Sequence, residues 1–314
     1  MTAPARDTFE PYPPRFTKNL LHPKHWPMWC LMGLWYVISQ LPFGWQLAMG
    51  RNLGRLLKLI GGSRARIARI NIEKCFPELS TQEQTTLLNQ HFEALGIGFI
   101  EVGFGWWGRD KVVASLTHIE GIEHIRKPQA EGKGVFLLTN HFTPLEIVGR
   151  IAGHQFPCRV MYRKNDNPVF EWISCTCRSR HVDEFIPHKA VSHFLNYIRN
   201  GGVGIYMADQ DYRARHSVFA PFFGIPTATI RKPTEYVLET GAAIVPTQYW
   251  RLPGTQGYCI RFLPALENYP SGDDVADATR INKLTEDHIR VQPEQYLWPH
   301  RRFKHRPEGE KSFY

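Results

Sequence analysis

The sequence lacks the short patterns that mark several common enzyme classes. It contains no G-x-S-x-G nucleophile elbow, no H-E-x-x-H zinc motif and no Walker A phosphate loop. Its six cysteines include no C-x-x-C pair, and none has the spacing of a zinc site. A covalent enzyme intermediate therefore has no candidate nucleophile, and we expect neither a metal ion nor another cofactor.

Cysteine is also distributed without a disulfide pattern. Only Cys175 and Cys177 are close together, and the sequence has no cleavable secretory signal. We therefore expect reduced thiols and a catalytic part that faces the cytoplasm.

Acidic side chains are outnumbered by basic ones. The 38 Lys and Arg residues exceed the 29 Asp and Glu residues, which gives a net charge of +9. Such a surface attracts an acidic partner, whether nucleic acid, anionic lipid, a phosphorylated substrate or an acidic protein. Because no aromatic and basic nucleic-acid motif is present, we do not expect nucleic acid.

The N-terminal part divides into three regions. Residues 1–25 are rich in proline and predict an irregular leader, and residues 26–47 are almost wholly apolar. As one helix, residues 26–47 would be about 33 Å long, enough to cross a bilayer. We therefore expect a hydrophobic membrane helix here. Pro42 can break it, leaving a shorter interfacial segment, and a soluble core helix is the alternative.

A helical region is expected over residues 48–115, partly at the membrane interface. Apolar residues recur at helical spacing over residues 51–73 against a basic face, which suits either anionic lipid or solvent. Ser80 and Glu83 form a capping-box pattern that begins a helix. This helix ends in residues 103–108, which fit G-x-G-x-x-G but follow a helix, so close helix packing or an interfacial tryptophan belt explains them better than a dinucleotide site.

Beyond residue 115 short apolar runs alternate with amphipathic segments. This alternation predicts an α/β catalytic domain over residues 116–314, with a mostly parallel central sheet flanked by helices. Strands are expected at 135–138, 159–162, 203–207, 243–249 and 258–263, and helices near 144–154, 168–179, 189–199, 231–240 and 274–291.

The strongest candidate site follows the first of these strands. His141 stands at the strand end, and Glu146 comes five residues later, after Pro144 at the start of the next helix. A carboxylate that holds one imidazole nitrogen lets the other accept a proton from a hydroxyl. We therefore interpret His141 as a general base oriented by Glu146. The alternative is a surface helix-capping pair.

Four blocks in the same order carry a resemblance to a known family. They are NHFTPLE at 140–146, YRKNDNP at 162–168, MADQDYR at 207–213 running on to SVFAPFF at 217–223, and QYLWPHRRFK at 295–304. Together with LLHPKHW at 20–26 and RPEG at 306–309, they resemble the late acyltransferases of lipid A biosynthesis, in particular the lauroyltransferase branch. These are membrane relatives of the glycerolipid acyltransferases, which share an H-x4-D/E motif.

The resemblance implies a reaction, its substrates and a location. An acyl chain, lauroyl in our interpretation, would pass from acyl carrier protein to the 3-hydroxyl of a hydroxyacyl chain on the anionic precursor Kdo(2)-lipid IV(A). This would take place at the cytoplasmic face of the inner membrane. Neither acyl chain length, the acceptor's acylation state nor oligomeric state follows from the sequence.

Further residues of these blocks are candidates for substrate binding. Arg163 follows a strand and could meet a phosphate or the thioester, or else pair with Asp166. Asp209 and Asp211 follow another strand and could position Arg163 or the acceptor sugar, or simply make a turn. Phosphate contacts, or else only solvated charge, are expected of Arg213, Arg215, Arg301, Arg302 and Lys304. An acyl channel or core packing is expected for Phe219, Phe222 and Phe223.

Two other functions compete with this interpretation. A glycerolipid acyltransferase of the lysophosphatidate type, using acyl-CoA or acyl carrier protein, would share the His141 and Glu146 pattern but not the combination of blocks. A non-catalytic basic protein that binds membranes would show no turnover dependent on these residues.

Overall fold

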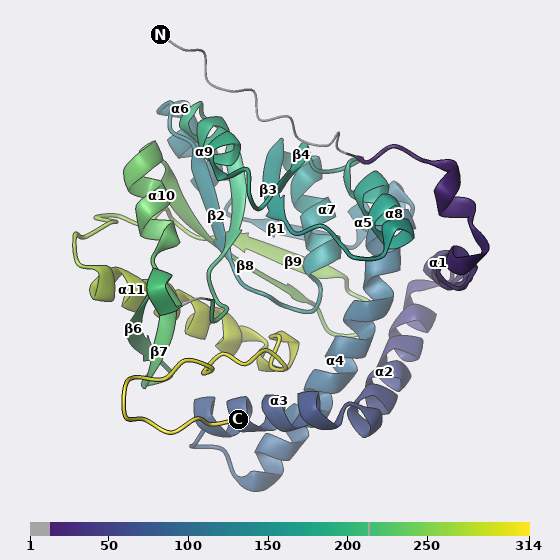
Figure 1. Cartoon of the computed structure of the whole chain (residues 1–314), viewed down its shortest axis with the longest axis horizontal. Helices are drawn as coiled ribbons and strands as arrows, with labels where there is room; N and C mark the ends of the chain where they lie inside the picture. Colours follow the sequence, from purple (N-terminus) through teal and green to yellow (C-terminus); the bar gives the residue numbers. More distant parts are fainter. Residues whose placement is uncertain (1–12, 213) are drawn as a thin grey trace.

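A computed structural model describes residues 13–212 and 214–314 of the chain. A central sheet is flanked by helices, and a layer of long helices runs down one side of the molecule (Figure 1). The N-terminal helices are α1 (Trp26–Ser39), α2 (Phe43–Ile60), α3 (Gly62–Cys75), α4 (Thr81–Trp107) and α5 (Asp110–Ser115). The others are α6 (Glu123–Ala130), α7 (Leu145–Gln155), α8 (Pro168–Arg178), α9 (Val191–Arg199), α10 (Lys232–Thr240) and α11 (Asp274–Val291).

The central sheet has seven strands in the order β1-β9-β8-β2-β5-β3-β4. All neighbouring pairs are parallel except β8 and β9, so the predicted mostly parallel sheet is confirmed. Strands β6 and β7 form a separate antiparallel hairpin. The strands are β1 (Thr117–Glu120), β2 (Val135–Thr139), β3 (Cys158–Tyr162), β4 (Glu184–Pro187), β5 (Val203–Met207), β6 (Ser217–Phe222), β7 (Ile225–Ile230), β8 (Ala243–Arg251) and β9 (Tyr258–Phe262).

Both faces of the sheet are covered. On β2, Val135 and Leu137 belong to the core that includes residues of α4 and α7, whereas Phe136 and Leu138 pack with residues of α9, α10 and α11. A strand buried on both faces has no polar side to alternate with its apolar side. This explains why β2 appears in the sequence as a continuous apolar run.

The predicted apolar helix over residues 26–47 is two helices. Helix α1 ends at Ser39, and α2 begins after Pro42, whose ring lacks the N–H that a continuing helix needs. Among the described residues, no helix is both long and apolar enough to cross a membrane. The expectation of a spanning helix is therefore not supported, and the break expected at Pro42 is confirmed.

Close packing joins α2 to α4. A Cβ atom on Gly54 would lie 2.0 Å from the carbonyl oxygen of Phe92, and one on Gly96 would lie 2.2 Å from that of Gly50. Glycine is therefore required at both positions for the two backbones to approach so closely. The capping box of Ser80 and Glu83 begins α4 as predicted.

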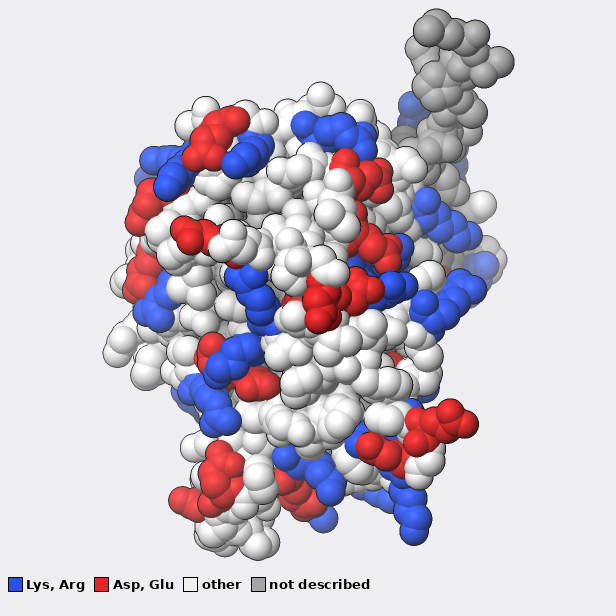
Figure 2. Space-filling model, turned by 90° about the vertical axis from the view of Figure 1, so that its left-hand side faces the viewer, with Lys and Arg blue, Asp and Glu red and all other residues white. Residues whose placement is uncertain are grey.

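The positive charge is concentrated in the N-terminal helices. Residues 11–72 contain no Asp or Glu but nine Lys and Arg residues, and the other 29 basic residues balance all 29 acidic ones. On the opposite side of the molecule, the face that includes α10 and α11, both signs of charge are interspersed (Figure 2). The net charge of +9 thus comes from one segment of the chain.

Candidate active site

The imidazole of His141 lies just beyond the carboxyl end of β2, where the sequence placed it. Its Nδ1 is 2.7 Å from Oδ1 of Asp209, and its backbone N–H donates to Oδ2 of Asp209 over 2.9 Å. Asp209 follows β5, which pairs with β2 in parallel so that Thr139 lies opposite Met207. The adjacent strand ends therefore bring the two side chains together.

This pair forms a buried base with its orienting group. The Asp209 side chain is 1% exposed and that of His141 is 24% exposed. Burial alone favours a neutral imidazole, but the Asp209 charge and hydrogen bond raise the pKa of His141 above its usual value. Burial opposes ionisation of Asp209 too, yet the charge and hydrogen bonds of His141 lower the pKa of that carboxyl. Nε2 of His141 has no hydrogen-bond partner among the described residues, so it is available to a substrate.

The predicted contact between His141 and Glu146 is wrong. Arg178 of α8 donates to both carboxylate oxygens of Glu146 over 2.7 Å, and Nε1 of Trp106 donates to Oε1 over 2.6 Å. The physical reason is that Glu146 lies in the first turn of α7, which packs against α4, so its side chain meets α4 and α8. Burial acts to raise the pKa of Glu146, but the Arg178 charge and these hydrogen bonds lower it.

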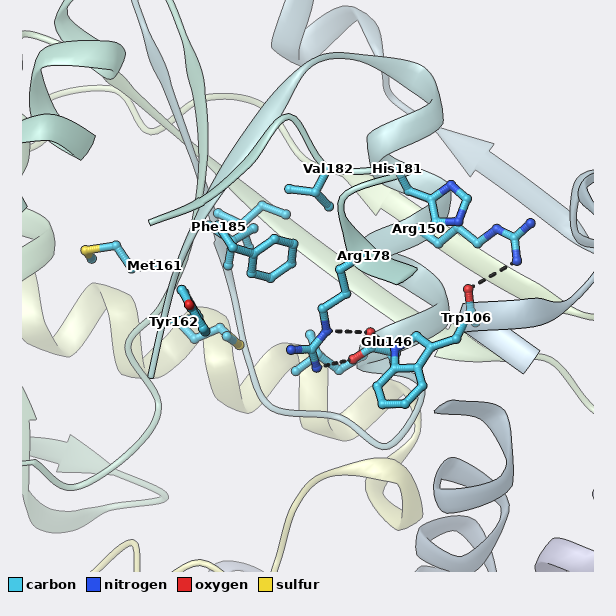
Figure 3. A pocket seen from close by; sticks show the side chains of 15 residues that line it. Trp106, Glu146, Arg150, Met161, Tyr162, Arg178, His181, Val182 and Phe185 are labelled. Atoms are coloured by element: carbon cyan, nitrogen blue, oxygen red, sulfur yellow. Dashed lines mark hydrogen bonds and ion pairs between the residues drawn. The ribbon is translucent and has the colours of Figure 1, made fainter. Parts of the chain in front are cut away.

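A mostly apolar cavity adjoins this ion pair. Its volume is about 190 Å³, and Glu146, Arg178 and Trp106 lie together at its wall (Figure 3). The remaining wall consists chiefly of Leu145, Val160, Met161, Val182, Phe185, Ile205 and Met207. Tyr162 and Met207, the last residues of β3 and β5, line the cavity, so it lies at the same edge of the sheet as His141 and Asp209, although neither of these two lines it. Such a space accepts an apolar chain better than a polar one.

Buried polar groups hold the loop that carries His141. The side chain of Asn140 is bonded to Thr285 over 2.9 Å and to His288 over 3.2 Å. The hydroxyl of Tyr249 donates to the carbonyl of Asn140 over 2.5 Å, and the ring of Phe142 stacks on His288 at 3.8 Å. Burial lowers the pKa of His288 to about 4, so this ring is neutral at physiological pH. The loop is thus fixed before any substrate binds.

Of the other expected site residues, Arg163 and Arg215 are exposed and the second aspartate is buried. Arg163 is exposed just after β3, and no ion pair with Asp166 is present in the described parts of the chain. Arg215 is exposed and donates to His216 over 3.0 Å, whereas Arg213 lies outside the described residues. Asp211 is buried and accepts from the backbone N–H of His305 over 2.8 Å. Neither Asp209 nor Asp211 contacts Arg163 in the described structure, so that expected role is corrected.

Two residues expected to meet substrate are part of the core. Arg302 is 2% exposed and donates to the carbonyl of Ala228 over 2.7 Å and to Asn282 over 3.0 Å, so it supports the β6–β7 hairpin. Phe222 is 1% exposed, which favours the core packing alternative over an acyl channel. The phosphate contact expected of Arg302 is thus corrected, because burial by distant elements cannot be seen in a local run of residues, and for Phe222 the structure decides between two open alternatives.

Sequence reasoning missed the groups that complete the site. Arg178 stands in the last turn of an expected helix, where a basic residue is common, so nothing singled it out. Asp209 was singled out as a strand-end residue, and the neighbouring order of β2 and β5 would have identified it as the partner of His141. Trp106 belongs to the cluster at 103–108, for which close helix packing or an interfacial tryptophan belt was expected. Its 2% exposure, and the 3.3 Å that would separate a Cβ atom on Gly105 from Cγ of Glu146, favour the packing.

The arrangement can activate a hydroxyl group. Because Nδ1 of His141 faces a carboxylate, the proton of the neutral ring resides there and Nε2 can accept a proton from an acceptor hydroxyl. The resulting imidazolium is stabilised by Asp209. The hydroxyl oxygen can then attack a carbonyl carbon delivered by a chain in the apolar cavity.

Comparisons with known proteins agree with this chemistry. The family model of the bacterial lipid A biosynthesis acyltransferases matches residues 13–305. The chain is 37% identical to the lipid A biosynthesis lauroyltransferase of Escherichia coli (strain K12) over 96% of this chain and 99% of that protein. It is 33% identical to the palmitoleoyltransferase of the same organism over 96% and 98%, and 26% identical to its myristoyltransferase over 95% and 93%. The chain therefore belongs to the bacterial lipid A biosynthesis acyltransferase family and is an acyltransferase.

Proposed function

We propose that this acyltransferase moves a lauroyl group from acyl carrier protein to the 3-hydroxyl of a hydroxyacyl chain on Kdo(2)-lipid IV(A). The observation that carries the proposal is the His141 and Asp209 pair beside an apolar cavity of about 190 Å³. A secondary hydroxyl is a weak nucleophile at neutral pH, so a positioned base is what its direct acylation requires.

The acyl group passes directly from thioester to hydroxyl, with no acyl-enzyme, by addition to a tetrahedral species and its collapse. Nε2 of His141 takes the hydroxyl proton while the oxygen bonds to the thioester carbon. The species then collapses, the bond from carbon to sulfur breaks and the thiol leaves with the proton. Arg163, exposed after the neighbouring strand, is proposed to contact the thioester region or a phosphate. Glu146 acts by fixing Arg178 and the wall of the cavity.

The relatives support lauroyl over other chains. Identity falls from 37% with a lauroyltransferase to 33% with a palmitoleoyltransferase and 26% with a myristoyltransferase. The small cavity beside Glu146 suits a short saturated chain, because each added methylene must find space against its packed walls.

An anionic membrane is the proposed location, with the catalytic domain on the cytoplasmic side of the inner membrane. Helices α1 and α2 expose large apolar side chains in a segment that has no acidic residue. Among these, Leu59 is 82% exposed, Ile60 is 70% exposed and Trp45 is 66% exposed. Apolar contact together with basic flanks is the combination by which helices lie on anionic lipid. The same positive segment would attract the acidic acyl carrier protein.

Purified protein in lipid A precursor micelles tests the function directly. We expect transfer from lauroyl carrier protein at least tenfold faster than from the myristoyl or palmitoleoyl forms, measured by mass spectrometry of the product. Lysophosphatidate offered as the acceptor should give no product. A preference for lysophosphatidate, or for another acyl chain, contradicts the corresponding part of the proposal.

A further inference from the structure

A second histidine is held by an aspartate in the same way as His141. The backbone N–H of His305 donates to Oδ2 of Asp211 over 2.8 Å, and its Nδ1 is 2.5 Å from Oδ1. In the first pair, the backbone N–H and Nδ1 of His141 meet the two oxygens of Asp209 at 2.9 and 2.7 Å. The two aspartates are separated by one residue in the loop after β5. The chain thus presents two similarly oriented imidazoles from one loop.

The second pair is buried at the carboxylate and open at the ring. The Asp211 side chain is 0% exposed, whereas that of His305 is 34% exposed. Nε2 of His305 has no hydrogen-bond partner within the described residues, and Nδ1 is occupied by Asp211. Nε2, directed away from Asp211, is an N–H donor when both ring nitrogens carry protons, and an anion bound beside the ring favours that form.

The segment that carries His305 is basic. Lys304 precedes His305 and is exposed, and Arg301 is exposed on the same C-terminal segment. The segment contacts the aspartate loop a second time, because the backbone N–H of Asp211 donates to Nε2 of His300 over 3.2 Å. By contrast, Arg306 is occupied by the carbonyl of Pro226 and by Glu310, so it is not part of this surface.

We infer that His305 is a positioning residue that binds a phosphate group of the acceptor lipid through Nε2. This inference rests on the proposed function and deepens it, because it assigns the anionic part of the acceptor to a place beside the catalytic base. An Nε2–H donor on a segment that also carries the exposed side chains of Lys304 and Arg301 is suited to an anion. The shared loop then fixes the distance between the bound phosphate and Nε2 of His141, and so selects which hydroxyl reaches the base.

Two substitutions separate binding from structural support. In His305→Asn the amide replaces the Nδ1–H donor to Asp211 but removes Nε2, whereas His305→Gln places a donor near Nε2. We expect the Asn variant to keep its melting temperature and its kcat within about threefold, while KM for the bisphosphorylated acceptor rises about 10- to 100-fold, the range for a hydrogen bond to a charged group. The Gln variant should recover part of this loss.

The controls are a matched histidine and a matched lipid. His193 is also paired with a carboxylate, that of Glu184, and is similarly exposed, but it lies on α9 away from the site. His193→Asn should therefore leave the KM for the acceptor lipid and the KM for the acyl donor unchanged. With acceptor from which the phosphates have been removed, wild-type protein should show a KM raised at least as much as in His305→Asn, and His305→Asn should then have the same KM as wild type.

Several outcomes would overturn the inference. If His305→Asn leaves the KM for the acceptor unchanged, Nε2 does not bind the acceptor. If it raises the KM for acyl carrier protein instead, the contact is with the donor. If wild-type protein does not distinguish the two acceptors, the inference is wrong even should the variant fail to fold. A wild-type protein that acylates neither lipid would instead refute the proposed function.

Discussion

The substitution Asp209→Asn tests which carboxylate orients the catalytic imidazole. Asp209 accepts two hydrogen bonds from His141, one from the backbone N–H over 2.9 Å and one at Nδ1 over 2.7 Å. The backbone group can only donate, so the amide oxygen of an asparagine must face it. The amide NH₂ then faces Nδ1 and requires this nitrogen to be an acceptor. The ring proton moves to Nε2, where the base is needed.

The expected loss follows from this change of tautomer. A base whose acceptor nitrogen carries a proton is inactive, and the equivalent change in other His and Asp pairs costs about 10⁴ in rate. We therefore expect kcat to fall about 10³- to 10⁴-fold, or roughly 4 to 5.5 kcal/mol of activation free energy. The volume is unchanged and both hydrogen bonds are retained, so the melting temperature should stay within a few degrees.

The pH dependence supplies an independent measurement. In wild-type protein Asp209 holds the pKa of His141 above its usual value of 6.5, so kcat/KM should decline on the acid side with a midpoint above 6.5. In the Asn variant this midpoint should move to lower pH, because the stabilising charge is lost. A folded variant that keeps more than a tenth of the wild-type rate, with an unmoved acid limb, would refute the assignment of Asp209.

Three further changes have defined outcomes. Glu146→Gln should lower the melting temperature, since the half-buried guanidinium of Arg178 loses the negative charge of Glu146, and it should reduce kcat less than Asp209→Asn does. The reverse order in single-turnover kinetics would restore Glu146 as the orienting group. Burial lowers the pKa values of His91 and His288 from 6.5 to about 4, so as pH falls the unfolded chain binds protons before the folded protein does. The free energy of unfolding should therefore drop by about 3 kcal/mol per histidine between pH 6.5 and pH 4, measured as a falling midpoint of urea denaturation. A midpoint that does not change with pH would contradict this. The double variant Leu59→Glu, Ile60→Glu should bind anionic vesicles at least tenfold more weakly in a sedimentation assay, with an unchanged rate on detergent-dispersed substrate. Unchanged vesicle binding would mean that another surface of the protein contacts the membrane.

Local signals predicted the elements well where one run of residues decides the outcome. The helix at Asp274–Val291 and the strand at Val203–Met207 have the bounds expected from their periodicity. The short edge strands β1 and β4 were missed, because four residues give too little alternation to recognise. In the long apolar stretch the length suggested one helix, whereas Pro42 correctly indicated the break between α1 and α2.

The site was predicted in its residues but not in its pairing. His141 was found because a strand end followed by a helix start is visible in the sequence. Its partner was not, because the order of strands in a sheet depends on crossovers that no local pattern records. Glu146 was the nearest carboxylate along the chain, while Asp209 is the nearest in space. Buried support such as that of Asn140 by His288 likewise joins residues far apart in sequence.

The glycine contact between α2 and α4 has a mechanical consequence. With backbones in direct contact at Gly54 and Gly96, the two helices cannot slide past each other without a clash, so they move as one body. Helix α4 is 27 residues long, or about 40 Å, and its far end carries Trp106 against Glu146. In the proposed docked state, this rigid pair would set the height of the catalytic histidine above the lipid surface. The acceptor's hydroxyl would then have to move out of the bilayer by a fixed distance to reach His141, whatever the thickness or fluidity of that bilayer.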